Sequence, residues 1–174
     1  MDKKVICHAP LNLLALTLSE GATARVEQVR KKLWQREGEL LSLALCPLIP
    51  LKWSNEPLPP FEQLQLPQMP ARTTFDQVAV KEGVLYLKNK DPDYLEVVEK
   101  IKGTYPGGNE LSYPFPPSSG ILLGGGEWSD EPLEIVNDDW RLLYFKIGWH
   151  SLAGQLLHLT LQVLTNRHLV KLNL

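Results

Sequence analysis

Long apolar runs are missing from this chain of 174 residues, and no stretch approaches the roughly 20 apolar residues that a transmembrane helix needs. An excess of one charge is missing too, because 18 Lys and Arg residues stand against 20 Asp and Glu residues. The formal net charge of −2 gives no general attraction to a phosphate backbone. We therefore expect a globular protein whose partner is neither a membrane nor a nucleic acid.

Cysteine is scarce as well. Cys7 and Cys46 are the only two, and they form neither a C-x-x-C pair nor another metal-binding spacing. This excludes a disulfide framework and gives no reason to expect a metal or a cofactor. Both residues lie in apolar, strand-like sequence, so we expect buried free thiols in a reducing compartment and hence a cytoplasmic location.

The sequence near the N-terminus has a strand–helix–strand pattern. Residues 11–18 (LNLLALTL) predict a strand, and a helix follows over residues 19–35 with Ser19 as its N-cap. Residues 39–45 (ELLSLAL) predict the second strand. One side of the helix is expected to be buried through its apolar stripe, which consists of Ala22, Val26, Val29 and Leu33. Its basic run VRKKLWQR, residues 29–36, is interpreted as a solvated face.

The same pattern occurs a second time. Residues 83–89 predict a strand, and Asp91 is expected to cap a helix that ends at Gly103, with Pro92 in its first turn. Residues 118–125 predict the next short strand. The apolar stripe of this helix consists of Tyr94, Leu95, Val98 and Ile101.

Between the two units lies a segment rich in proline, which holds seven of the chain's 14 prolines between Pro47 and Pro70. Proline disrupts central strands and long helices, so this segment predicts a long ordered loop or connector. We expect one bilobal domain over residues 1–174, divided into a first unit (11–46), a proline-rich connector (47–72), a second unit (73–125) and a closing hairpin (140–165). Residues 73–81 are expected to form one strand.

The closing hairpin has two strands with alternating apolar residues, which predicts its register. The apolar face Leu143, Phe145, Ile147 and Trp149 should meet Leu157, Leu159, Leu161 and Val163. An odd number of loop residues would produce this match. His150 and His158 should then lie on the same face, opposite or diagonal to each other.

This order of elements resembles the 2H phosphoesterase superfamily, which contains 2′–5′ RNA ligase-like proteins and cyclic phosphodiesterases. The resemblance rests on LALTLSEGATARVEQVRKKL (residues 14–33), on PFPPSSGILLGGG (114–126) and on the closing hairpin. It implies an α+β fold in which two lobes, related by an approximate two-fold axis, carry antiparallel sheets around a central cleft. In that family each lobe presents a His-x-Thr/Ser-x strand to the cleft.

The chemistry of the family explains this spacing. Side chains at positions i and i+2 of a strand lie on the same face. Two imidazoles on either side of a phosphate can act as general base and general acid, since their ordinary pKa lies near 6.5. The two hydroxyls can donate hydrogen bonds to the phosphoryl oxygens as charge develops.

Carried over to this chain, the first motif falls on Ser42 and Ala44 and the second on Gly120 and Leu122. A slip of two residues would place the second motif on Ser118 and Gly120 instead. Both histidines are replaced in either case. The resemblance therefore predicts the fold of the family without its reaction, because these side chains supply neither a base nor an acid.

One His-x-Thr-x pattern does occur, at His158 and Thr160 in QLLHLTLQVL, but it lies in the closing hairpin where the family has no motif. We interpret these two residues as part of the wetter face of a strand. Residues 127–139 are similarly interpreted as a solvated acidic loop, and GGGEW (124–128) as a flexible turn.

Two functional hypotheses follow. The favoured one is a non-catalytic protein that binds an unknown small ligand or protein, through the cleft or through the proline-rich segment with Trp53 and Phe61. The alternative is a divergent phosphoesterase acting on cyclic nucleotides or RNA ends with substitute histidines, drawn from His150, His158 and His168 and assisted by Thr160.

Overall fold

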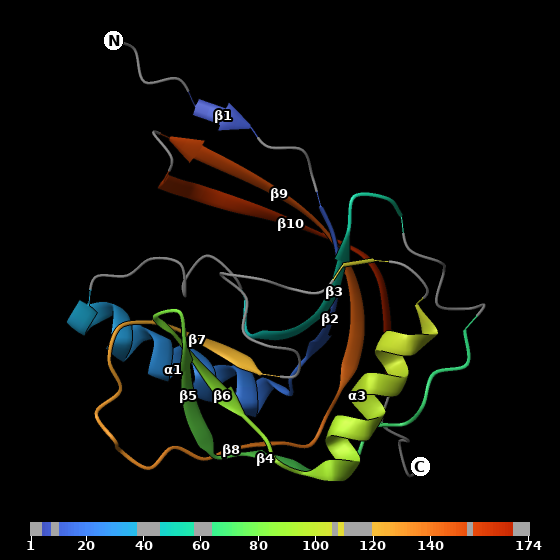
Figure 1. Cartoon of the computed structure of the whole chain (residues 1–174), viewed down its shortest axis with the longest axis horizontal. Coiled ribbons are helices and arrows are strands. Elements are labelled where there is room, and N and C mark those ends of the chain that lie inside the picture. The colour runs from blue at the N-terminus through green and yellow to red at the C-terminus, as the bar shows by residue number, and fades with distance from the viewer. Residues whose placement is uncertain are drawn as a thin grey trace.

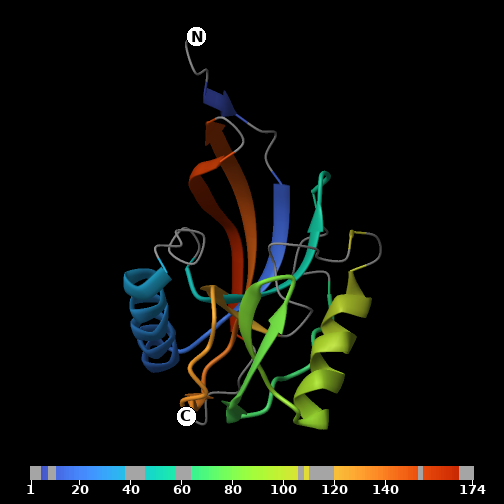
Figure 2. The ribbon, with the colours of Figure 1, turned by 60° about the vertical axis from the view of Figure 1, so that its left-hand side comes forward.

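A computed structural model describes residues 5–7, 11–37, 46–57, 64–105, 108–109, 120–152 and 155–168. Its largest sheet has five antiparallel strands in the order β1-β9-β2-β3, with β10 also paired to β9 (Figure 1). These strands are β1 (Val5–Cys7), β2 (Leu11–Thr17), β3 (Leu48–Ser54), β9 (Arg141–Leu152) and β10 (Gln155–His168). The ends of β9 and β10 extend with β1 beyond the rest of the protein (Figure 2).

The other strands in the described part of the chain form two smaller antiparallel sheets. One consists of β5 (Gln77–Lys81), β6 (Val84–Lys88) and β7 (Ile121–Gly125), and the other pairs β4 (Thr73–Phe75) with β8 (Ile135–Asn137). Glu82 and Gly83 join β5 to β6 with φ values of 52° and 77°, the left-handed conformation that a tight two-residue hairpin requires. The prediction of one strand over residues 73–81 is wrong, because the chain changes sheet at Asp76.

Two helices flank the strands, α1 (Glu20–Glu37) and α3 (Pro92–Thr104), on opposite sides in Figure 2. Both predicted N-caps are confirmed. The Ser19 hydroxyl accepts a hydrogen bond from the Ala22 amide at 3.3 Å, and the Asp91 carboxylate accepts one from the Asp93 amide at 3.0 Å. Helix α3 runs one residue past Gly103, to Thr104.

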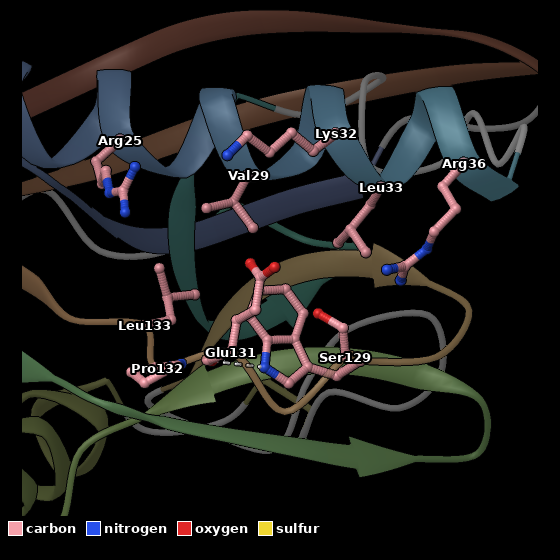
Figure 3. A pocket seen from close by; sticks show the side chains of 10 residues that line it. Arg25, Val29, Lys32, Leu33, Arg36, Ser129, Glu131, Pro132 and Leu133 are labelled. Carbon is pink, nitrogen blue, oxygen red and sulfur yellow. Dashed lines mark hydrogen bonds between the residues drawn. The ribbon is translucent and has the colours of Figure 1, made fainter.

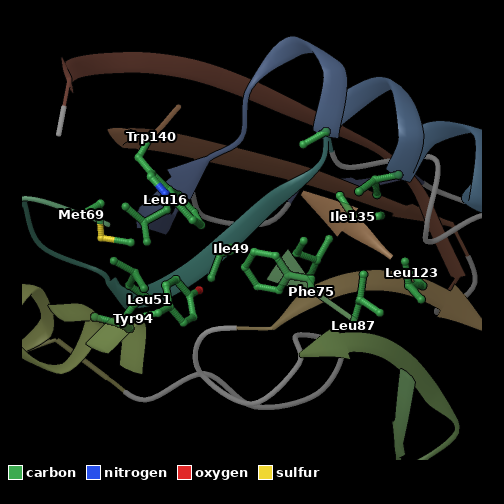
Figure 4. Packing of buried hydrophobic residues seen from close by; sticks show 14 of the residues in the cluster. Leu16, Ile49, Leu51, Met69, Phe75, Leu87, Tyr94, Leu123, Ile135 and Trp140 are labelled. Atoms are coloured by element: carbon green, nitrogen blue, oxygen red, sulfur yellow. The ribbon is translucent and has the colours of Figure 1, made fainter. Parts of the chain in front are cut away.

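A smaller apolar cluster, which includes Leu13, Ala15 and Phe145, covers one face of β2. The main core lies between the sheets and the helices and covers the other face of β2 through Leu14 and Leu16. Phe75, Tyr94 and Trp140 form its aromatic centre, with ring centroids 5.4 to 6.1 Å apart (Figure 4). The predicted stripe of α1 is buried throughout. In α3 the prediction is wrong for Leu95, which is 37% exposed because it lies beside the buried face and not on it.

The predicted register of the closing hairpin is confirmed for Phe145, Ile147 and Trp149. It is wrong for Leu143, which lies opposite Asn166 because the register shifts again between Val163 and Thr165. Trp149 lies opposite Leu159, Ile147 opposite Leu161 and Phe145 opposite Val163. The cause differs from the expected one, since only two residues separate Leu152 from Gln155. An irregularity between Leu156 and His158 supplies the extra residue that keeps the apolar faces together.

The proline-rich segment was predicted as a loop, and that prediction is wrong for its first part. β3 contains Pro50 and pairs with β2 across a register shift at Leu14 and Ala15. β3 ends the order of strands in its sheet, and among the described residues its outer side makes one short bridge, between Trp53 and Asn109. Proline is tolerated in such an edge strand, which explains how the segment can pair.

The α+β class with antiparallel sheets and a closing hairpin is confirmed. The approximate two-fold axis and the bilobal division remain predictions. The predicted strand over residues 39–45 lies outside the described residues. Within the part of the chain that is described, no helix combines the length and the apolar character needed to cross a membrane.

Candidate functional site

The structure places only half of the four positions predicted from the motif resemblance. Gly120 is buried directly before β7, and Leu122 is buried within it. Ser42, Ala44 and the alternative Ser118 lie outside the described residues, as does Phe61. The described strand that follows α1 and pairs with β2 is β3, whose sequence LIPLKWS contains no histidine, serine or threonine before Ser54.

Leu122 contributes its backbone to an unexpected contact. The Arg30 guanidinium donates two hydrogen bonds to the Leu122 carbonyl oxygen, from Nε at 2.9 Å and from Nη2 at 2.7 Å. Only 2% of Arg30 is exposed, and burial lowers its pKa to about 10 while Glu27 opposes this shift. The solvated-face interpretation of residues 29–36 is therefore wrong for Arg30, which remains charged at neutral pH and joins α1 to β7.

The substitute histidines lie in the closing hairpin. His150 of β9 is directly opposite His158 of β10, as predicted, and Thr160 is opposite Gly148. His168 lies at the other end of the hairpin, opposite Arg141. The register thus brings together His150 and His158 and separates both from His168.

A groove of about 230 Å³ opens between α1 and the loop that follows β7. Figure 3 shows Arg25, Lys32 and Arg36 along the helix, facing the segment that carries Ser129 and Glu131. The ring of Trp128 and four apolar side chains line the rest of the groove. The four are Val29, Leu33, Pro132 and Leu133. We call this space, with these ten lining residues, the α1 groove.

Hydrogen bonds hold the loop side of the α1 groove in place. The Trp128 indole Nε1 donates to the Glu131 carbonyl oxygen at 3.1 Å, and the Arg36 guanidinium donates to the Glu127 carbonyl oxygen. Asp130, with φ 57°, supplies a left-handed residue between them. The predicted acidic loop is thus exposed at Glu127, Asp130 and Glu131 but is folded against the helix.

The charges of the α1 groove favour an anion. Its lining residues include three cations, Arg25, Lys32 and Arg36, and one carboxylate, Glu131, which leaves a net charge of about +2. A half-buried aromatic ring beside exposed guanidinium groups suits a ligand that joins an anionic group to a flat apolar part.

Sequence reasoning missed the α1 groove. Arg25, Lys32 and Arg36 are seven and four residues apart and so share one side of a helix, a signal that is present in the sequence. The loop that completes the groove lies about 100 residues further along the chain, and nothing local connects the two.

Only Cys46, of the two cysteines, can be compared with the prediction of buried thiols. Cys46 is exposed, so the prediction of a buried thiol is wrong for this residue, which precedes β3 at the surface. Cys7 lies in β1, opposite His150. Among the residues whose side chains are described, no three His, Cys, Asp or Glu residues gather as a possible metal site.

The predicted fold was compared with the folds of known proteins. No family model matches the chain, and no curated protein matches its sequence. Two solved structures of E. coli LigT, a 2H phosphoesterase, do match, each over 94% of this chain and 100% of the other. The complex with 3′-AMP gives a TM-score of 0.58 at 14% identity, and the apo form 0.59 at 12% identity.

The chain has a 2H phosphoesterase-like fold. The resemblance seen in the order of elements is therefore confirmed at the level of fold. At 12 to 14% identity the likeness extends to the fold alone, so activity has to be argued from the residues of this chain.

Proposed function

We propose that this protein is a non-catalytic member of the 2H phosphoesterase-like fold that acts by binding a ligand. One observation carries the proposal: the four histidines are His8, His150, His158 and His168, so the chain has none between residues 9 and 149. Both strand–helix–strand units lie inside that interval. No choice of register can therefore supply either unit with the histidine that the family's reaction needs.

Apolar side chains occupy β7, where the second motif was predicted, and β3, the described strand that follows α1. In β3, Ile49 and Leu51 belong to the main core, and in β7, Ile121 and Leu123 do so. Apolar groups cannot transfer a proton to the attacking or leaving oxygen of a phosphoester. Two such losses remove general base and general acid together, each of which contributes typically 10²–10⁴-fold to a rate.

The α1 groove is the binding site that we assign to this function. Its net positive charge, its aromatic ring and its volume suit a small molecule with a phosphate or carboxylate group and a flat ring. E. coli LigT, which shares the fold, has been crystallised with 3′-AMP, a molecule of this chemical class. We therefore use 3′-AMP as the probe of binding.

The alternative function keeps catalysis and uses substitute histidines. The direct opposition of His150 and His158, with Thr160 two residues further along the same strand, is the observation that favours it. Two imidazoles within reach of one phosphate could in principle divide the roles of acid and base. They would act from the hairpin and not from β3 and β7.

The deciding experiment compares hydrolysis of 2′,3′-cyclic nucleotides by purified wild-type protein and by His158→Ala. We expect no turnover above a buffer control in either protein. His168→Ala is the matched control, because His168 lies at the far end of the same hairpin. Turnover in the wild type that is lost in His158→Ala and kept in His168→Ala would refute the proposal and establish the alternative.

A further inference from the structure

The loop side of the α1 groove joins an aromatic ring to a carboxylate. The Trp128 indole Nε1 donates a hydrogen bond of 3.1 Å to the backbone carbonyl oxygen of Glu131, so the ring and the backbone of Glu131 hold each other in place. The Trp128 ring also packs against the main core, and both residues line the groove. A surface for stacking and a hydrogen-bond acceptor therefore lie next to each other on one wall of the groove.

The backbone around Glu131 is fixed from both sides. Pro132 follows it, and the residue before a proline is restricted to extended conformations. Leu133 is buried and belongs to the main core, which anchors the loop directly after Pro132. A ligand in the groove thus meets a carboxylate on a backbone that is already ordered, which lowers the entropy cost of recognition.

The Glu131 carboxylate is open to a ligand. Figure 3 shows it directed from the loop toward α1. Among the described residues, none donates a hydrogen bond to this carboxylate and no cation forms an ion pair with it. An ionised carboxylate only accepts hydrogen bonds, and its two oxygens can take two parallel donors. The group therefore has unused capacity for a ligand that carries N–H donors side by side.

We infer that Glu131 makes the α1 groove select guanine nucleotides over adenine nucleotides. This role rests on the proposed binding function and names the base that the groove prefers. The cations Arg25, Lys32 and Arg36 on α1 suit the phosphate, and the Trp128 ring suits the face of the base. The edge of a base that stacks on Trp128 is then the part that meets Glu131.

The two purines differ in what this edge offers to a carboxylate. Guanine carries two adjacent donors, N1–H and N2–H, which match the two oxygens of one carboxylate. Adenine carries one donor, N6–H, beside the lone pair of N1, and this lone pair is repelled by a carboxylate oxygen. A bidentate contact of this kind discriminates against the wrong base by about 10-fold.

The test is isothermal titration calorimetry of the full chain with 3′-GMP and with 3′-AMP. We expect the wild-type protein to bind 3′-GMP about 10-fold more tightly than 3′-AMP. 3′-IMP should bind with intermediate affinity, because its base keeps N1–H but lacks the N2 amino group. Glu131→Gln should abolish the preference for 3′-GMP, since glutamine offers one acceptor and one donor, which is the pattern that the adenine edge requires.

Glu134→Gln is the matched control. Glu134 is exposed near the end of the same loop and does not line the groove, so the variant removes the same charge and should keep the wild-type preference. Lys32→Gln is a second comparison. It should weaken 3′-GMP and 3′-AMP by the same factor, because the phosphate that Lys32 attracts is common to both nucleotides.

The outcomes separate this inference from the proposed function. Equal affinities of the wild type for 3′-GMP and 3′-AMP would overturn guanine selection and leave the binding function standing. An equal gain in affinity for both nucleotides in Glu131→Gln would also overturn it, because the carboxylate would then act only by repelling the phosphate. Absence of binding of both nucleotides and of inorganic phosphate would overturn the binding function together with guanine selection.

Discussion

The Arg30 guanidinium holds the Leu122 carbonyl oxygen with two hydrogen bonds, of 2.9 and 2.7 Å, across the boundary between α1 and β7. Hydrogen bonds from a charged group to a buried acceptor are stronger than those between neutral groups. This contact therefore anchors α1 to β7, the strand that we predicted to carry the second motif. The Leu122 carbonyl has a structural role in this chain.

Replacing Arg30 by Met should destabilise the protein by about 2–3 kcal/mol, since the methionine keeps an apolar side chain but removes the charged donors. Urea denaturation at neutral pH measures the change in the free energy of unfolding. Lys31→Met is the matched control, because Lys31 is the next residue and is exposed, and surface changes of this kind stay within about 0.5 kcal/mol. Equal stability of the two variants would contradict the anchoring role.

Local signals explain which parts of the fold could be predicted from the sequence. The caps Ser19 and Asp91 depend on residues within one helical turn, and both are confirmed. The register of β9 and β10 depends on the alternation of apolar residues. It is confirmed from Phe145 to Trp149, although an irregularity between Leu156 and His158 replaces the expected odd loop. In these cases the interaction that decides the structure lies close in the sequence or repeats with a simple period.

The remaining features depend on partners that are distant in the sequence. Pro50 argues against a strand until one knows that β3 lies at the edge of its sheet. Arg30 looks like part of a solvated basic run until Leu122 is placed beside it. The α1 groove exists only because the loop around Trp128 packs against α1, so composition and periodicity could not reveal this candidate site.

Removal of the Asp91 cap should weaken α3. The Asp91 carboxylate accepts a hydrogen bond from the Asp93 amide at 3.0 Å, so Asp91→Ala is expected to cost about 1 kcal/mol. Asp91→Asn is the control, because asparagine also serves as an N-cap and should restore most of the loss. The free energies of unfolding of the three proteins decide the point, and an alanine variant as stable as the asparagine variant would show that the cap contributes nothing.

Tyr94 should make the protein less stable at alkaline pH. The side chain is fully buried, and this burial raises its pKa well above the ordinary value of 10.0. Above about pH 10 the unfolded chain loses the phenolic proton while the folded protein keeps it. The folded state then binds more protons, so stability falls as the pH rises, by up to about 1.4 kcal/mol per pH unit.

The comparison that isolates this effect is wild type against Tyr94→Phe, because Arg30 and other alkaline groups titrate in both proteins. We expect the difference in the free energy of unfolding between them to be constant from about pH 7 to 9. Above about pH 10 it should shift in favour of the phenylalanine variant. A difference that stays constant through that range would mean that Tyr94 ionises equally in both states.

Binding of an anion in the α1 groove should depend on Lys32. Lys32 lines the groove, whereas its neighbour Lys31 is exposed on the same helix and does not line it. We expect Lys32→Gln to weaken binding of 3′-AMP by about 5- to 10-fold, which corresponds to about 1–1.4 kcal/mol for the loss of one charged contact. Isothermal titration calorimetry with the full chain measures the dissociation constant.

Lys31→Gln is the matched control for that experiment, since it changes the net charge by the same amount on the same helix. If the groove binds the phosphate, Lys31→Gln should reproduce the wild-type dissociation constant, while added salt should weaken wild-type binding because it screens exposed charges. If both variants weaken binding equally, only the general field of the protein attracts the nucleotide.

Trp128→Leu separates the two parts of the ligand. The affinity for 3′-AMP should fall while that for inorganic phosphate stays the same, because only the nucleotide has a ring to place against the indole. Equal effects on both probes would remove Trp128 from the site.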